Sequence, residues 1–177
     1  MKTLYSILVL ATIISCAPSL SYYTQNTDDS LVRDDSDPGK IQFYVSNDII
    51  LWREISKGES TISNGKIKMV NGREVEEVII KRGTPGVYLF SPQKKQYAIC
   101  FDPNDDSKYL IFGPSEKTGD RYVLLAKEWD RRKGKVTYGD KVYNTSAESA
   151  FAYLMASVTK TKNTRVSSDT PSGRKVQ

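Results

Sequence analysis

Short strand-like runs separated by turn residues constrain the fold of this chain more than any other feature. Two Asn-Gly pairs, Asn64-Gly65 and Asn71-Gly72, flank the run Lys66–Val70, and Asn-Gly favours two-residue hairpin turns because both residues tolerate positive φ. The pairs predict a three-stranded meander that ends in Val75–Ile80. Similar runs are Ile41–Val45, Ile49–Arg53, Val87–Phe90, Tyr97–Phe101, Tyr109–Phe112 and Tyr122–Ala126, and Tyr138–Lys141 predicts one more hairpin. Many short strands at this spacing predict a mostly β barrel or sandwich.

The stretch Val78–Leu89, followed by Tyr97–Phe101 and Tyr109–Phe112, contains a Gly-turn-Gly-Val element between two expected strands. This pattern resembles the core of SH3-like barrels, in which such an element joins two strands and short hairpins complete the closure. The resemblance lies within residues 75–126 and implies a small SH3-like or related antiparallel barrel or sandwich. It implies no function, since one fold hosts many.

One segment near the C-terminal end of the domain predicts either a helix or a strand. Thr145-Ser-Ala-Glu148 is a capping box ahead of Ala150–Ala156, so a helix of about three turns starting at Ser146 is expected within residues 146–157. Ala152, Leu154 and Ala156 also alternate with less apolar residues, as a strand would. We favour the helix and leave the strand open.

The N-terminus has the pattern of an export signal. Lys2 precedes the apolar run Leu4–Ile14, which is too short to span a bilayer core of roughly 30 Å and has the length of a signal-peptide core. The residues that follow, Ile13-Ile14-Ser15-Cys16, resemble the lipobox of bacterial lipoproteins. The resemblance implies that residues 1–15 are a signal peptide and that Cys16 is acylated and anchored in a lipid bilayer.

Two alternatives to this anchor stay open. Ser15-Cys16-Ala17 also fits ordinary signal peptidase, which would release a soluble protein, and Cys16 could pair with Cys100, the only other cysteine. If Cys16 is acylated, Cys100 has no cysteine partner. It lies in the apolar run Tyr97–Phe101, where a free cysteine behaves as a small buried hydrophobe, and we expect it to be inert.

The segment after Cys16 has the composition of an acidic tether. Five aspartates between residues 17 and 40 stand against Arg33 and Lys40, and the scattered apolar residues bury too little surface to offset the entropy of ordering. We therefore expect residues 16–40 to be a lipidated cysteine with a flexible tether. Asp29-Ser30-Leu31 resembles the motif at which Bacteroidota O-glycosylate exported proteins, which implies Ser30 as a glycosylation site. Surface-displayed lipoproteins of that phylum carry acidic residues directly after the cysteine, and their absence here implies an outer-membrane position facing the periplasm.

Residues 41–159 have the length of a single domain, and residues 160–177 read as a basic, disordered tail. The formal net charge of the chain is +5, of which the tail carries +4, the domain +3, the tether −3 and Lys2 +1. The domain itself is therefore only mildly basic.

The residue inventory excludes several kinds of catalysis. The chain has no histidine, which excludes Ser-His and Cys-His nucleophiles and most catalytic zinc sites, and it has no phosphate-binding glycine loop. Asp102, Asn104 and Asp106 begin a calcium loop, but the turn glycine and the closing glutamate are missing. Glu74, Glu76 and Glu77 are expected on the exposed face of a hairpin. We expect no catalytic residue, metal or cofactor.

Two groups of residues are candidates for binding. The first is a basic turn after Trp129, formed by Lys127, Arg131, Arg132 and Lys133. Such a turn is ordinarily a solvated hairpin tip, but it would also suit an acidic partner such as anionic lipid or a cell-wall polymer. The second consists of the strand tyrosines. They are expected to pack in the core or across strands, but if Tyr88 and Tyr109 share an exposed face they would form a platform for sugar or peptide.

These observations predict a non-catalytic envelope lipoprotein that acts as an accessory or scaffold and contacts another envelope protein. The alternative is a binding module for a cell-wall or polysaccharide ligand, and a carboxylate-based hydrolase is a more distant possibility. Nucleic acid is not expected as a partner in the compartment that the signal implies.

Overall fold

The computed structural model describes residues 19–55, 66–130 and 133–157. Strands hold 52% and helices 15% of this part, and the strands form two antiparallel sheets, so the mostly β prediction is confirmed. The signal segment, Cys16, Asn64-Gly65, Arg131, Arg132 and the tail from residue 160 lie outside the described residues. No helix in the described ranges is both long and apolar enough to cross a membrane.

The first sheet contains seven strands in the order β1-β13-β2-β6-β7-β8-β9. Their bounds are β1 Ser21–Tyr22, β13 Leu154–Ala156, β2 Phe43–Val45, β6 Pro85–Phe90, β7 Tyr97–Cys100, β8 Tyr109–Ser115 and β9 Arg121–Leu124. Isolated bridges pair Thr24 with Arg121 and Val123 with Tyr153, so the two edges of the sheet approach each other. No closed barrel is found in the described residues, and the SH3-like resemblance stays a prediction.

The second sheet contains six strands in the order β10-β11-β12-β3-β5-β4. They are β10 Lys127–Asp130, β11 Lys133–Tyr138, β12 Lys141–Ser146, β3 Ile49–Glu54, β5 Arg73–Ile80 and β4 Lys66–Val70. Asn71 and Gly72 both have positive φ, 49° and 77°, which confirms the predicted two-residue turn between β4 and β5. The other hairpin of the predicted meander, at Asn64-Gly65, lies outside the described residues, and in the described part β5 lies between β4 and β3.

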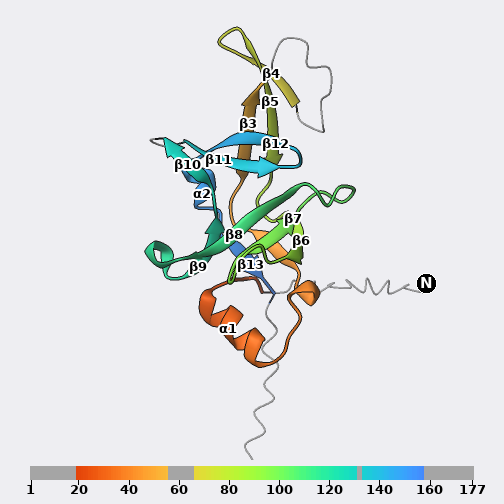
Figure 1. Cartoon of the computed structure of the whole chain (residues 1–177), viewed down its shortest axis with the longest axis vertical. Helices are drawn as coiled ribbons and strands as arrows, with labels where there is room; N and C mark the ends of the chain where they lie inside the picture. Colours follow the sequence, from red (N-terminus) through yellow and green to blue (C-terminus); the bar gives the residue numbers. More distant parts are fainter. Residues whose placement is uncertain (1–18, 56–65, 131–132, 158–177) are drawn as a thin grey trace, which may run out of the picture.

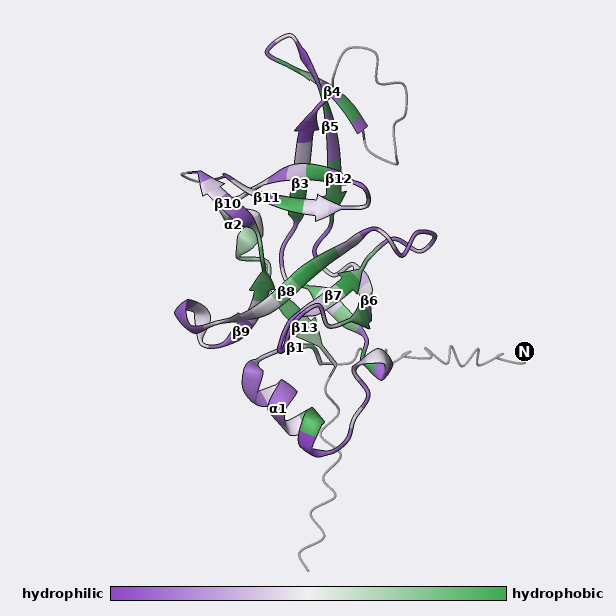
Figure 2. Ribbon diagram, viewed as in Figure 1, coloured by the Kyte–Doolittle hydropathy of each residue, from purple (hydrophilic) through white to green (hydrophobic). Residues whose placement is uncertain are grey.

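One hydrophobic core joins the two sheets. Phe43, Ile99, Leu110 and Phe112 of the first sheet belong to the same buried cluster as Leu51 of the second. Figure 2 shows hydrophobic residues gathered in β6, β7, β8 and β13, whereas much of α1 is hydrophilic. Cys100 is buried, as predicted, and burial raises the pKa of its thiol. Its low reactivity is still a prediction.

The N-terminal segment corrects the expectation of a flexible tether over residues 16–40. In its described part, β1 pairs with β13, helix α1 spans Gln25–Arg33 and a 3-10 turn, η1, spans Pro38–Lys40. Thr24 caps α1 by accepting a hydrogen bond from the backbone N–H of Thr27 at 3.2 Å. Tyr23 is completely buried. The polar composition of this segment wrongly predicted disorder, because β1 pairs with β13 from the other end of the chain and the segment buries Tyr23 against the first sheet.

Asp28 fastens α1 to the first sheet. Its carboxylate is buried and accepts hydrogen bonds from the hydroxyls of Tyr23, at 2.9 Å, and Tyr97. Ser30 lies in the same helix, where its hydroxyl donates to the backbone carbonyl of Asn26 at 2.8 Å. The folded domain therefore begins near residue 21 rather than at residue 41.

Both predictions for residues 146–157 are partly right. The short helix α2 covers only Ala147–Ala150, capped by the Ser146 hydroxyl, which accepts from the N–H of Ser149. The chain then forms β13, in which Leu154 and Ala156 are buried. The helix therefore ends at Ala150, and β13 lies between β1 and β2, where its alternate side chains pack into the core.

Candidate functional site

The candidate site lies on the outer face of the second sheet, the face directed away from the shared core. On β3, Ile49 and Leu51 point into the core while the residues between and after them point outward, because successive strand residues alternate. The register places Trp52 opposite both Glu77 of β5 and Asn144 of β12. Strands far apart in sequence therefore present their side chains on one surface, which we call the outer face.

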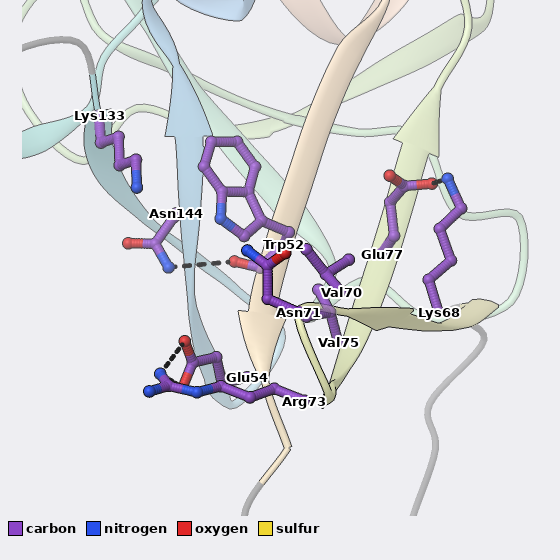
Figure 3. A pocket seen from close by; sticks show the side chains of 10 residues that line it. All are labelled: Trp52, Glu54, Lys68, Val70, Asn71, Arg73, Val75, Glu77, Lys133 and Asn144. Carbon is purple, nitrogen blue, oxygen red and sulfur yellow. Dashed lines mark hydrogen bonds and ion pairs between the residues drawn. The ribbon is translucent and has the colours of Figure 1, made fainter.

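An open hollow of about 580 Å³ lies on the outer face beside the β4–β5 hairpin. Figure 3 shows the ten residues that line it: Trp52, Glu54, Lys68, Val70, Asn71, Arg73, Val75, Glu77, Lys133 and Asn144. Trp52 is half-buried, and the side-chain amide of Asn144 donates to its backbone carbonyl at 3.3 Å. The hydrogen bond ties β12 to β3 at the floor of the hollow.

Ion pairs occupy the rim of the hollow. Arg73 donates to both carboxylate oxygens of Glu54, at 2.9 and 3.0 Å, and Lys68 pairs with Glu77. The Arg73–Glu54 pair is largely solvent-exposed and contributes little to stability, whereas the Glu77 side chain is only 16% exposed. Both pairs therefore place a positive and a negative side chain at the edge of the hollow, where a bound partner would contact them.

The outer face has an excess of positive charge. Alternation and register place six cations on it, and the carboxylates beside them are Glu54, Glu77, Glu128 and Asp130. Glu128 pairs with Lys135 at 2.5 Å. The cations are Lys66, Lys68, Arg73, Lys127, Lys133 and Lys135. A surface of this kind attracts an acidic partner over about a Debye length.

Aliphatic side chains continue the outer face beyond the hollow. Ile50 and Ile79 are direct cross-strand neighbours, and both are exposed, as is Val142 of β12. The row formed by Trp52, Glu77 and Asn144 lies between the Ile50–Ile79 pair and Val142. The exposed aliphatic side chains therefore lie on both sides of Trp52, with charged and polar groups among them.

The structure does not bring the predicted site residues together: the described lysines lie on the second sheet and the tyrosines on the first. Lys133 lines the hollow, and Lys127 is exposed on β10 opposite Lys135, whereas Arg131 and Arg132 lie outside the described residues. Tyr88 pairs with Ile99 and Tyr109 with Cys100. Adjacent positions of β7 face opposite ways, so these two tyrosines lie on opposite faces of the first sheet.

The tyrosines therefore form no common platform. Tyr88 packs against Tyr97 with ring centroids 5.0 Å apart, and Tyr109 packs against Phe90 at 5.1 Å. Tyr97 and Tyr122 are buried. Core and cross-strand packing, the ordinary role of strand tyrosines, is confirmed for this set.

Glu76 corrects the expectation that three glutamates share an exposed face. It is 0% exposed and accepts a hydrogen bond from Nε of Arg53 at 2.6 Å, while Nζ of Lys141 lies 3.8 Å away. The expectation ignored alternation, which forbids Glu76 and Glu77 from sharing a face. Glu76 points to the interior opposite Arg53, and Glu77 points to the outer face.

The acidic loop after β7 also has a structural explanation. Lys108 lies 3.2 Å from a carboxylate oxygen of Asp102 and 3.4 Å from one of Asp105. Asp105 in turn accepts from the N–H and hydroxyl of Ser107. No cluster of metal-ligating side chains is found within the described ranges.

Sequence reasoning missed Trp52, Arg73 and Asn144 as members of one site. The alternation in Ile49–Glu54 does place Trp52 and Glu54 on one face, but no local signal pairs β3 with β12 across some ninety residues. Comparison with family models, with curated proteins and with solved structures found no match to this chain.

Proposed function

We propose that this protein is a non-catalytic lipoprotein of the bacterial envelope that serves as a scaffold. In this proposal Cys16 is acylated after export, and the outer face binds another envelope protein. The observation that carries the scaffold role is the outer face itself, where exposed Ile50, Ile79 and Val142 adjoin a rim rich in lysine and arginine. Its partner is a protein surface that carries both aliphatic and acidic side chains.

The anchor and the location follow from the N-terminal residues. The apolar run Leu4–Ile14 followed by Ser15-Cys16 supports export and acylation, and the residues after Cys16 support an outer-membrane position facing the periplasm. Several acyl chains would hold the protein durably, since each buried CH₂ contributes about 0.8 kcal/mol.

A cell-wall polymer or polysaccharide is the second candidate ligand, because Trp52 lies in the hollow with an amide and ion-paired groups around it. This ligand is less well supported because Tyr88 and Tyr109 lie elsewhere, so Trp52 is the single aromatic ring that lines the hollow among the described residues. A carboxylate-based hydrolase has less support, since Glu54 and Glu77 each face a cation.

Fatty-acid labelling tests the anchor. Wild-type protein grown with a labelled fatty acid should carry the label and partition into detergent, and Cys16→Ser should do neither. An unlabelled wild-type protein would refute acylation.

Photo-crosslinking tests the scaffold. A photoreactive amino acid at Val142 on the outer face is compared with one at Val87 on the first sheet, and the exposed fractions are similar, 57% and 50%. The Val142 probe should give a discrete adduct with one envelope protein, and the Val87 probe should not. Lys68→Glu and Lys133→Glu together should weaken the adduct several-fold. Equal adducts from both positions, or adduct to polysaccharide alone, would contradict the scaffold.

A further inference from the structure

The chain between the proposed anchor and the folded domain is very short. Ser21 and Tyr22 are already paired with Ala156 and Met155 in the first sheet, and Tyr23 is completely buried. Only five residue steps separate Cys16 from Ser21, which span at most about 18 Å when fully extended. A tether of twenty-four residues could extend about 80 Å, so the short link keeps Ser21 much closer to the membrane than the expected tether would.

An aromatic and cationic cluster lies at the point where the chain enters the domain. The guanidinium of Arg121 stacks on the ring of Tyr22 at 4.3 Å and on that of Tyr153 at 5.2 Å. The two rings meet edge to face at 5.3 Å, and Tyr22 is 41% exposed. Tyrosine rings favour the headgroup level of a bilayer, where one side is apolar and the other wet, and a guanidinium binds phosphate.

The outer face lies at the other end of the molecule. Figure 1, drawn with the longest axis vertical, shows α1 at one end and the β4–β5 hairpin at the other. The segment from β1 to η1 belongs to the α1 end, next to the chain entry.

We propose that the α1 end of the domain lies against the phospholipid headgroups, with the Tyr22–Arg121–Tyr153 cluster in contact with them. The outer face is then held on the side away from the membrane, where a partner protein can reach it. This inference rests on the acylation of Cys16 proposed above and adds an orientation to it.

The charges at the α1 end select the kind of lipid. Asp34, Asp35 and Asp37 are exposed there, and the exposed cations beside them in sequence are Arg33 and Lys40. With Arg121 included, these three carboxylates face three cations, so this end has no excess of positive charge to attract anionic lipid. The contact is therefore with zwitterionic phospholipid and is centred on Arg121 and the two tyrosines.

Energy transfer to the membrane tests the orientation. Acylated full-length protein is prepared with a fluorophore at Val32→Cys in α1 or at Met69→Cys in β4, two side chains with matched exposure of 67% and 66%. Each is placed in phosphatidylethanolamine–phosphatidylcholine vesicles that contain a headgroup-linked acceptor. Transfer from position 32 should exceed transfer from position 69 several-fold. Inserting twenty Gly/Ser residues between Pro18 and Ser19 should reduce this ratio, because such a coil averages about 25 Å.

The outcomes separate the orientation from the anchor. Labelled fatty acid on Cys16 together with equal or greater transfer from position 69 would overturn the orientation and leave the anchor intact. An unchanged ratio after the insertion would also overturn it, because the short link would not set the geometry. Absence of fatty acid from Cys16, with both labels remaining in solution, would refute the anchor instead.

Discussion

Strands β7 and β4 are similar in length, yet they show opposite burial. All four residues of β7 are buried, and all five of β4 are exposed. β7 lies between β6 and β8 in the first sheet, whereas β4 is the last strand of the second sheet in the described part of the chain. The first sheet therefore encloses this part of the core on both sides, whereas the β4 edge of the second sheet extends away from the core and presents a surface.

The two sheets also accommodate a buried carboxylate differently. Asp28 is held by tyrosine hydroxyls of the first sheet, and Glu76 by the guanidinium of Arg53 in the second. Hydroxyl donors need no compensating charge, whereas a buried ion pair depends on both partners staying in place. The first sheet should therefore be sensitive to ionisation of its buried tyrosines, and the second to loss of either partner of the Arg53–Glu76 pair.

Alkaline pH should affect the first sheet most. Burial raises the pKa of Tyr23, Tyr97 and Tyr122 well above their ordinary value, and the nearby Asp28 carboxylate acts in the same direction. Above pH ~10 the unfolded chain releases these three protons and the folded chain keeps them, so these three groups alone lower the free energy of unfolding by up to about 4 kcal/mol per pH unit. Burial also raises the pKa of Tyr138 and Tyr143 in the second sheet, which adds to the fall. Urea unfolding at several pH values from 9 to 11 measures this. A constant free energy over that range would show that the three hydroxyls are accessible.

Two adjacent tyrosines give a matched test of the same sheet. Tyr23→Ala should destabilise the protein by about 4 kcal/mol, because a fully buried ring is lost. Tyr22→Ala should cost less than about 1 kcal/mol, since it removes only an exposed ring stacked on Arg121. Chemical denaturation measures both. Similar values for the two would mean that the N-terminal segment is not docked.

Two glutamates give the corresponding test in the second sheet. Glu76→Ala should cost about 3 kcal/mol, because it leaves the side chain of Arg53, only 13% exposed, without the carboxylate it faces. Glu54→Ala removes an exposed pair with Arg73 and should cost about 0.5 kcal/mol. Thermal and urea unfolding measure the loss of stability in both variants. A smaller loss for Glu76→Ala than for Glu54→Ala would contradict the structural role of Glu76.

Removing the tail should have the smallest effect. Residues 160–177 carry five lysines or arginines and no periodic apolar residues, whereas the last strand of the first sheet ends at Ala156. A protein truncated after Thr159 should keep its melting temperature within about 2 °C, as calorimetry would show. Unfolding of the truncated protein would mean that the tail contributes to the first sheet.

Local signals predicted much of the strand pattern and little of the site. Asn71-Gly72, the β7 run and the cap at Ser146 were recognised because their causes lie within a few residues of one another. The hollow was not recognised, because it forms only when β3, β5 and β12 are neighbours in the sheet. The burial of Tyr23 was not recognised either, because it depends on β13 at the opposite end of the chain.

The sequence by itself determined the strand-rich character, the hairpin turn at Asn71-Gly72, the burial of Cys100 and the absence of histidine chemistry. Turn geometry and alternation are local properties, so they can be read from neighbouring residues. Only the tertiary structure decided that residues 21–40 fold, that Glu76 is buried against Arg53, and that Trp52 meets Glu77 and Asn144 on one face. Each depends on which distant strand supplies the opposing surface, and strand preferences follow that context more than the intrinsic tendency of the residue.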